Sequence, residues 1–184
     1  MTDSFYYYFL PKLYYMKKHP HVPLNVSLRV ILIRHGEKPS KGDNLCPKGL
    51  NRALELPAVL DKMIGVPDFT YVPKIKTGDA TSSVRMFQTI TPFAVKHNLT
   101  INSSCKDAET GKVANSIKQH TGMVLAVWDH TNIPAIAAKL GVTGTLKWAK
   151  EDFDSIWIID FLKGETVPVL TIKQENLDPK GACK

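Results

Sequence analysis

Cysteine is scarce in this sequence, and long apolar runs and blocks of like charge are missing. The three cysteines are Cys46, Cys105 and Cys183; they lack the spacing of zinc ligands and cannot all pair. This count argues against a disulfide scaffold, since at most one bridge can form, and the sequence does not show whether it does. No apolar run approaches the length of a membrane span, and no basic block indicates a dedicated nucleic-acid-binding protein.

What is present is a basic chain of ordinary apolar content. Its 184 residues suffice for one domain with a full core, and its net charge of +7 favours anionic partners such as phosphorylated small molecules. We expect an aromatic N-terminal extension over residues 1–27, a single domain over 28–175 and a loose polar tail over 176–184. The N-terminus lacks the basic start and the small-residue cleavage site of a signal peptide, which favours a cytoplasmic protein. The oligomeric state is not indicated.

Strand-like and helical patterns alternate along most of the chain. The predicted strands cover residues 28–33, 70–75, 99–101 and 123–128, and the predicted helices cover 47–65, 83–96, 107–121 and 134–140. Pro57 lies inside the first helix and predicts a break or kink there. Two further runs, 155–162 and 166–174, predict a hairpin at one edge of the sheet. The fold class expected is α/β: a three-layer α/β/α sandwich whose sheet is mostly parallel with an antiparallel edge.

Two of the predicted strands end in a histidine. The buried run 30–33 leads directly into Arg34-His35-Gly36-Glu37, and the buried run 123–128 leads into Asp129 and His130. Ligand sites of open α/β sheets form beyond the carboxyl ends of the strands. If the two strands lie in one sheet and point the same way, the two imidazoles share this edge.

Arg85 is a third candidate, a cation at a helix position that does not favour cations. It lies in the first turn of the helix 83–96, where anions are favoured over cations, so it is better placed to hold an anion beside the helix. Arg34, Arg85 and a protonated His130 could clamp a phosphoryl group while a neutral His35 attacks phosphorus. This chemistry needs no cofactor and no metal, and no carboxylate–histidine cluster in the sequence indicates a metal site.

Four motifs in the same order resemble those of the histidine phosphatase superfamily, which includes the cofactor-dependent phosphoglycerate mutases. Leu32-Ile33-Arg34-His35-Gly36-Glu37 is similar to the nucleophile motif, and Leu45-Cys46-Pro47-Lys48-Gly49-Leu50-Asn51-Arg52-Ala53 to the helix start that follows it. Ser82-Ser83-Val84-Arg85-Met86-Phe87-Gln88-Thr89 resembles the stretch that supplies the pocket arginine. Val124-Leu125-Ala126-Val127-Trp128-Asp129-His130 resembles the strand that ends in the second histidine.

The resemblance implies that His35 is the nucleophile and that Arg34, Arg85 and His130 bind the phosphoryl group. One departure is Cys46, where the family commonly has Ser or Thr as a helix cap. We expect a weaker cap there rather than a lost activity.

The proton donor for the leaving group is left open. A carboxyl with a raised pKa is the usual source. Glu109 follows Arg85 at about the interval at which many family members carry their acidic residue, and we place it ahead of Glu37 and Asp129, which adjoin the two histidines in sequence.

The resulting prediction is a metal-independent phosphomonoester hydrolase that acts through a phosphohistidine on His35. Its substrate is a small phosphorylated molecule that the sequence does not identify, and phosphate or vanadate is expected to bind. One alternative is a phosphoglycerate mutase-type phosphoryl transfer, although the chain is short between its motifs and has little material for a closing lid. The other is a non-catalytic phosphate-binding module on the same fold.

Overall fold

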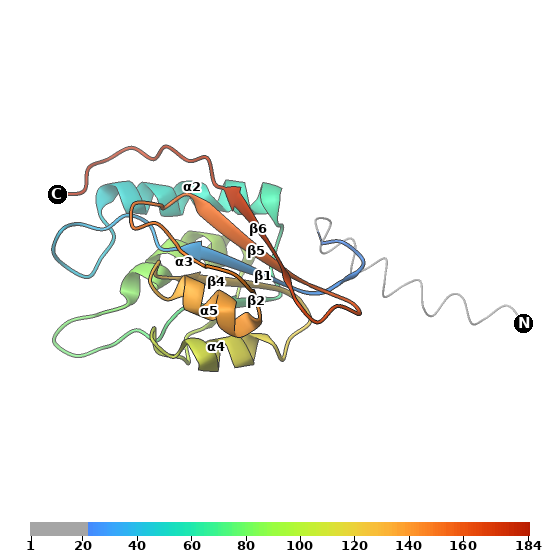
Figure 1. The fold of residues 1–184 in the computed structure, drawn as a ribbon. Coiled ribbons are helices and arrows are strands. Elements are labelled where there is room, and N and C mark those ends of the chain that lie inside the picture. The colour runs from blue at the N-terminus through green and yellow to red at the C-terminus, as the bar shows by residue number, and fades with distance from the viewer. Residues whose placement is uncertain (1–21) are drawn as a thin grey trace, which may run out of the picture.

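The computed structural model of this protein describes residues 22–184, which form one six-stranded sheet with helices on both faces (Figure 1). The aromatic extension expected over residues 1–27 lies for the most part outside the described residues. Within the described part, no helix is long and apolar enough to cross a membrane.

The sheet is mixed, as the alternation of patterns predicts. Its strands are β1 (Val26–Arg34), β2 (Phe69–Tyr71), β3 (Ile101–Asn102), β4 (Gly122–Trp128), β5 (Ser155–Leu162) and β6 (Val169–Gln174), in the order β3-β2-β4-β1-β5-β6. The first four strands in this order run parallel, and β5 and β6 add an antiparallel edge. The predicted α/β fold class is therefore confirmed.

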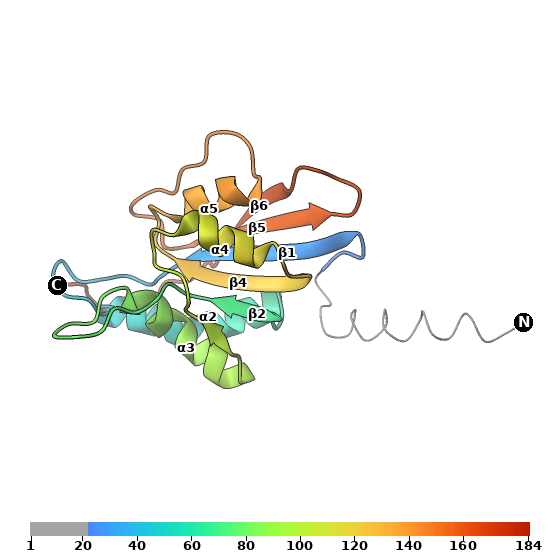
Figure 2. The ribbon, with the colours of Figure 1, turned by 90° about the horizontal axis from the view of Figure 1, so that it is seen from below.

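Two pairs of helices cover the two faces of the sheet (Figure 2). They are α2 (Pro47–Met63) with α3 (Val84–His97), and α4 (Thr110–Ile117) with α5 (Ile133–Leu140). One half of the core joins Ile31 and Ile33 of β1 to α2 and α3, and the other joins Val30 and Leu32 to α4 and α5. Because β1 is buried on both faces, its residues 30–33 form a continuous apolar run rather than an alternating pattern.

Of the break or kink predicted at Pro57, the break is wrong. Helix α2 continues through this residue to Met63, and Pro57 is one of the residues that α2 buries. A proline removes one backbone hydrogen bond from a helix, but tertiary packing of a buried face often outweighs local propensity. Helix α3 likewise continues through Pro92.

The C-terminal tail, which the sequence predicts to be loose, makes contacts with α2 and with the loop before it. It runs along α2 (Figure 1), where Asn51 Nδ2 donates to the carbonyl of Lys180 at 2.8 Å. Cys46, directly before α2, forms a disulfide with Cys183, and the third cysteine, Cys105, is buried and takes no part in it. The tail is thereby attached to the start of α2 and, through Ser40 N and the carbonyl of Lys184, to the loop before it.

Candidate active site

The two strands that end in histidine are neighbours in the sheet. β1 and β4 pair in parallel with Arg34 opposite Trp128, and His35 N continues the ladder by donating to the carbonyl of Trp128 at 3.0 Å. The strand ends therefore deliver His35 and His130 to the same edge, as the sequence predicts. Residues 35–37, which follow β1, are called the nucleophile loop below.

His35 is buried and held in one tautomer. His35 is only 4% exposed, and its Nδ1 lies 2.7 Å from the carbonyl oxygen of Gly36. Because a carbonyl can only accept, Nδ1 carries the proton and Nε2 keeps its lone pair. Burial, with smaller contributions from the charges of Arg34 and Arg85, lowers the pKa of His35 to about 4. At neutral pH the ring is thus an uncharged imidazole with a free nitrogen, the form that a nucleophile requires.

Arg34 is held by residues 150–153, a loop that no sequence motif marks as part of the site. Its Nη1 donates to the carbonyls of Lys150 at 2.6 Å and Asp152 at 2.9 Å, and its guanidinium carbon lies 3.7 Å from the centre of the Phe153 ring. Burial lowers the pKa of Arg34 to about 10, which still leaves it charged at neutral pH. Its Nε is buried and has no hydrogen-bond partner within residues 22–184.

His130 has a similar unpaired atom. Its Nδ1 is buried without a hydrogen-bond partner in the described part of the chain. Burial, followed by the nearby charge of Arg34, lowers the pKa of His130, so the ring is shifted toward the neutral form rather than the protonated one expected from the sequence. A bound anion would favour the proton again, since an opposite charge stabilises the charged form.

Arg85 lies in the first turn of α3, as predicted. Its Nε donates to the carbonyl of Asn44 at 3.1 Å, and its Nη2 donates to the carbonyl of Gly42. Burial lowers the pKa of Arg85 from its usual value. The guanidinium thus fastens the loop that follows the nucleophile loop while facing the same cavity as His35.

Two cavities open at this edge of the sheet, and they divide the predicted residues between them. The first, of about 420 Å³, is lined by His35, Asp43, Lys76, Ser82, Ser83, Arg85, Met86, Asp107, Asp129, Thr131 and Asn132. The second, of about 370 Å³, is lined by Arg34, Glu37, Lys38, Pro39, Ser40, His130, Lys150, Glu151, Phe153 and Cys183. The Phe153 ring contacts residues of both cavities. It stacks against the Arg34 guanidinium and meets the His35 ring edge-on, with 6.3 Å between the ring centroids. No group of three or more potential ligand side chains in residues 22–184 is arranged to hold a metal ion.

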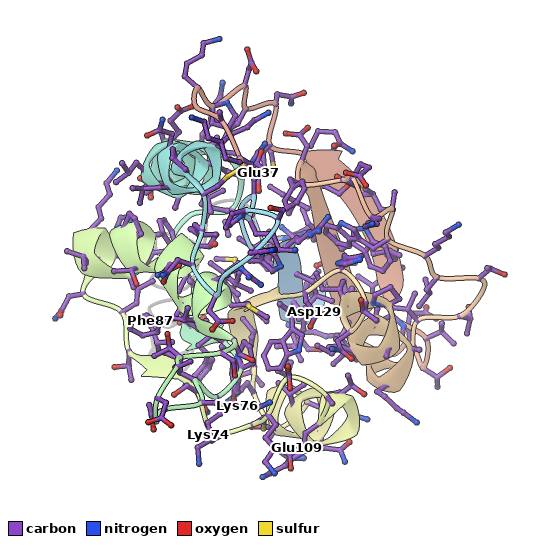
Figure 3. The ribbon with its side chains drawn as sticks, turned by 90° about the vertical axis from the view of Figure 1, so that its left-hand side faces the viewer. Glu37, Lys74, Lys76, Phe87, Glu109 and Asp129 are labelled. Carbon is purple, nitrogen blue, oxygen red and sulfur yellow. A yellow bond between two sulfur atoms is a disulfide. The ribbon has the colours of Figure 1, made fainter. Side chains whose placement is uncertain are left out.

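The structure separates the three candidate proton donors (Figure 3). Glu109 is on the outside, at the start of α4, where it accepts from Lys106 N at 2.7 Å; this hydrogen bond lowers its pKa, and the residue lines neither cavity. Glu37 lies beside α2. Asp129 lies near the centre of this edge and lines the cavity of His35. Only Asp129 of the three lines the cavity of His35, and it is this position that favours it, the last of the three in the sequence-based order. Its carboxylate is hydrogen-bonded too: Oδ1 accepts from Thr131 N and Asn132 N at 3.0 Å, and Oδ2 accepts from Asn132 Nδ2 at 2.8 Å.

Glu37 is committed to an ion pair. Arg52 of α2 donates to both of its carboxylate oxygens at 3.0 Å. Burial alone would raise the pKa of Glu37, but the hydrogen bonds from Arg52 outweigh it and hold the pKa below its usual value. A carboxyl kept ionised in this way is poorly suited to donate a proton.

A second carboxylate shares Arg52. Glu175 follows β6, and its Oε2 accepts from Arg52 Nη1 at 2.6 Å. Burial, together with the nearby charges of Asp154 and Glu37, outweighs the effect of Arg52 and raises the pKa of Glu175 to about 8, against 4.5 ordinarily. At neutral pH the folded protein therefore keeps a proton on Glu175 that the unfolded chain releases.

Replacing Glu175 by glutamine should remove a pH dependence of stability. In the wild type the folded state holds one more proton than the unfolded state between the two pKa values of Glu175. The free energy of unfolding should therefore fall as pH rises through this window, by up to about 1.4 kcal/mol per pH unit. Urea denaturation of both proteins at a series of pH values measures this. The stability of Glu175→Gln relative to wild type should rise with pH up to about 8, and a difference that stays constant would contradict it.

Asp107 is a carboxylate of the site that sequence reasoning missed. It lines the cavity of His35 and accepts from Ser83 Oγ at 3.3 Å. It lies only two residues before Glu109, and the spacing from Arg85 indicates Glu109, which lines neither cavity. Phe153 carried no local signal, since it reaches the site from the loop before β5.

The comparisons with known proteins agree on the fold. No protein-family model and no curated protein matches the sequence. A candidate phosphohistidine phosphatase, SixA, from Nakamurella multipartitia is similar over 80% of this chain and 96% of its own, with 13% identity and a TM-score of 0.58. A candidate alpha-ribazole-5'-P phosphatase from Escherichia coli matches over 80% and 96%, with 15% identity and a TM-score of 0.53.

A third solved structure holds a tetrahedral oxyanion. The protein histidine phosphatase SixA complexed with tungstate is similar over 80% of this chain and 97% of its own, with 13% identity and a TM-score of 0.55. The resemblance read from the four motifs is thus confirmed at the level of architecture. The chain has the α/β fold of the histidine phosphatases.

Proposed function

We propose that this protein is a phosphomonoesterase that passes the phosphoryl group of its substrate to His35 and then to water. The observation that carries the proposal is a pair of buried, unpaired atoms, Arg34 Nε and His130 Nδ1, at the same edge of the sheet as a neutral His35. Buried polar atoms are normally hydrogen-bonded, and an oxyanion would supply acceptors for both. The tungstate complex of the structurally similar SixA supports this interpretation.

The first step forms the phosphoenzyme. Nε2 of His35 donates its lone pair to phosphorus while the bond from phosphorus to the leaving oxygen breaks. Arg34 and Arg85 stabilise the charge on the transferring group from two sides. The leaving oxygen takes a proton, and we assign this proton to the carboxyl group of Asp129, which lines the cavity of His35.

The second step regenerates the enzyme. A water molecule attacks the phosphorus of the phosphoenzyme, gives a proton to the carboxylate of Asp129, and breaks the bond between phosphorus and Nε2. Inorganic phosphate leaves, and His35 is again a neutral imidazole. The chain itself supplies the charges around the phosphoryl group, so the proposed reaction needs no metal ion.

A phosphatase assay with two leaving groups tests the proposal. The wild-type protein should hydrolyse p-nitrophenyl phosphate with inhibition by vanadate and with full activity in EDTA. Asp129→Asn should lose more activity toward an alkyl phosphate than toward p-nitrophenyl phosphate, because p-nitrophenolate leaves readily without a proton. The expected ratio of the two losses is about tenfold or more.

The same assay distinguishes the alternatives. Vanadate binding without turnover would indicate a phosphate-binding module instead of an enzyme. Transfer of phosphate between positions of a phosphoglycerate, without release of inorganic phosphate, would indicate a mutase. Equal losses toward both substrates in Asp129→Asn would remove Asp129 from the role of the acid.

A further inference from the structure

Arg52 lies on the buried face of α2 between two glutamate side chains from distant parts of the chain. Its Nε and Nη2 donate to Glu37 at 3.0 Å each, and its Nη1 donates to Glu175 at 2.6 Å. The side chains of Arg52, Glu37 and Glu175 are only 5%, 10% and 1% exposed. Through Arg52, the nucleophile loop is therefore joined to the segment that follows β6.

The contacts of the nucleophile loop leave its backbone little freedom. Gly36 N donates to Thr89 Oγ1 of α3 at 2.9 Å, and the carbonyl of Glu37 accepts from Cys46 N at 3.0 Å. The two-pronged contact from Arg52 fixes the Glu37 side chain, two residues after His35. A rotation of the peptide at Glu37 would carry with it the Gly36 carbonyl, which holds the tautomer of His35.

Arg52 itself does not face the candidate active site. Among the described residues, it is not one of those that line the two cavities, whereas Glu37 lines the cavity of Arg34 and His130. Any influence of Arg52 on the reaction must therefore pass through Glu37 and the nucleophile loop.

We propose that Arg52 is a positioning residue for the nucleophile, and that Glu175 keeps Arg52 in place. This inference rests on the proposed function and adds to it a residue outside the cavities. A reacting atom displaced by about 1 Å can cost on the order of 100-fold in rate, so the loss of this contact should be visible in catalysis.

The competing explanation is that the ion pair only stabilises the fold. The chain contains a matched control for this, because Arg29 and Asp160 form a similar two-pronged pair between β1 and β5. Its distances are 2.6 and 2.7 Å, and Arg29 is 8% exposed. Arg29 lies in the first half of β1, whereas His35 follows the end of that strand.

The experiment compares Arg52→Met and Arg52→Lys with Arg29→Met and Arg29→Lys in the full chain. All variants are assayed with p-nitrophenyl phosphate well below their melting temperatures, and hydrogen exchange is followed at the amides of residues 34–38. Arg52→Met should lower kcat by about 10- to 100-fold with little change in KM, and Arg52→Lys should recover part of the loss. The Arg29 variants should lose stability to a similar degree but keep kcat.

The readouts separate this proposal from the proposed function. An inactive wild type overturns the proposed function, while faster exchange at residues 34–38 in Arg52→Lys but not in Arg29→Lys still supports the positioning role. If Arg52→Met does not fold, Arg52→Lys carries the comparison. Equal kcat and equal exchange in the Arg52 and Arg29 variants would overturn the positioning role and leave only a structural one.

Discussion

Alanine in place of His35 should abolish turnover, with a loss in kcat/KM on the order of 10⁴-fold or more. The reason is that no other group in the site combines burial at the end of β1, a free Nε2 and two nearby guanidinium groups. The variant should keep its fold, because within residues 22–184 the ring makes a single hydrogen bond, from Nδ1 to the carbonyl of the neighbouring Gly36. Steady-state kinetics with p-nitrophenyl phosphate measures the effect.

His120→Ala is the matched control for this variant. The His120 ring stacks on the Phe69 ring with a centroid distance of 3.7 Å, and its Nε2 lies 2.7 Å from the Tyr71 hydroxyl, so this half-buried histidine has a structural role. It precedes β4, at the opposite end of the strand from His130. Its loss should cost stability but leave kcat/KM within about threefold. An active His35→Ala protein would mean that the reaction does not pass through this imidazole.

Gly49→Ala should destabilise the protein by about 3 kcal/mol, at the upper end of what overpacking costs. A Cβ at Gly49 would contact the carbonyl oxygen of Glu37 and lie 2.6 Å from Glu37 N. Both atoms belong to backbone, so no flexible side chain can move aside. The first turn of α2 and the nucleophile loop must therefore move apart. Urea denaturation measures the loss, and reduced activity should accompany it because the displaced loop carries His35.

Gly111→Ala tests whether the effect is specific to this contact. Gly111 lies in α4, and a Cβ there would meet no atom within 4 Å. Alanine is a better helix former than glycine, so this variant should be neutral or slightly more stable. A Gly49→Ala protein as stable as wild type would show that the nucleophile loop and α2 do not pack as closely as described.

The strand arrangement could be predicted because buried strands have a recognisable pattern of apolar residues in the sequence. A parallel strand covered on both faces contains a continuous apolar run, as residues 30–33 of β1 and 123–128 of β4 do. The hairpin of β5 and β6 is marked by the turn between them. The course of α2 past Pro57 could not be predicted, because it depends on the core against which that helix packs.

The site could be predicted only where it follows local sequence. His35, His130 and Arg85 each stand at the end of a strand or the start of a helix, and the structure places them there. The partners of Arg34 come from residues 150–153, far along the chain, and nothing near them marks their role. Spacing indicates Glu109 as the acid, but its side chain accepts a hydrogen bond from Lys106 N and lies on the surface at the start of α4.

The claim that His35 becomes phosphorylated can be tested by trapping the intermediate. The wild-type protein is mixed with excess p-nitrophenyl phosphate, quenched within one turnover in alkali, where a phosphoramidate survives, and analysed by peptide mass spectrometry. We expect one phosphoryl group, lost on acid treatment, on the peptide that contains His35, and none in His35→Ala. Turnover without any phosphorylated peptide, or with the phosphoryl group on another residue, would contradict the account.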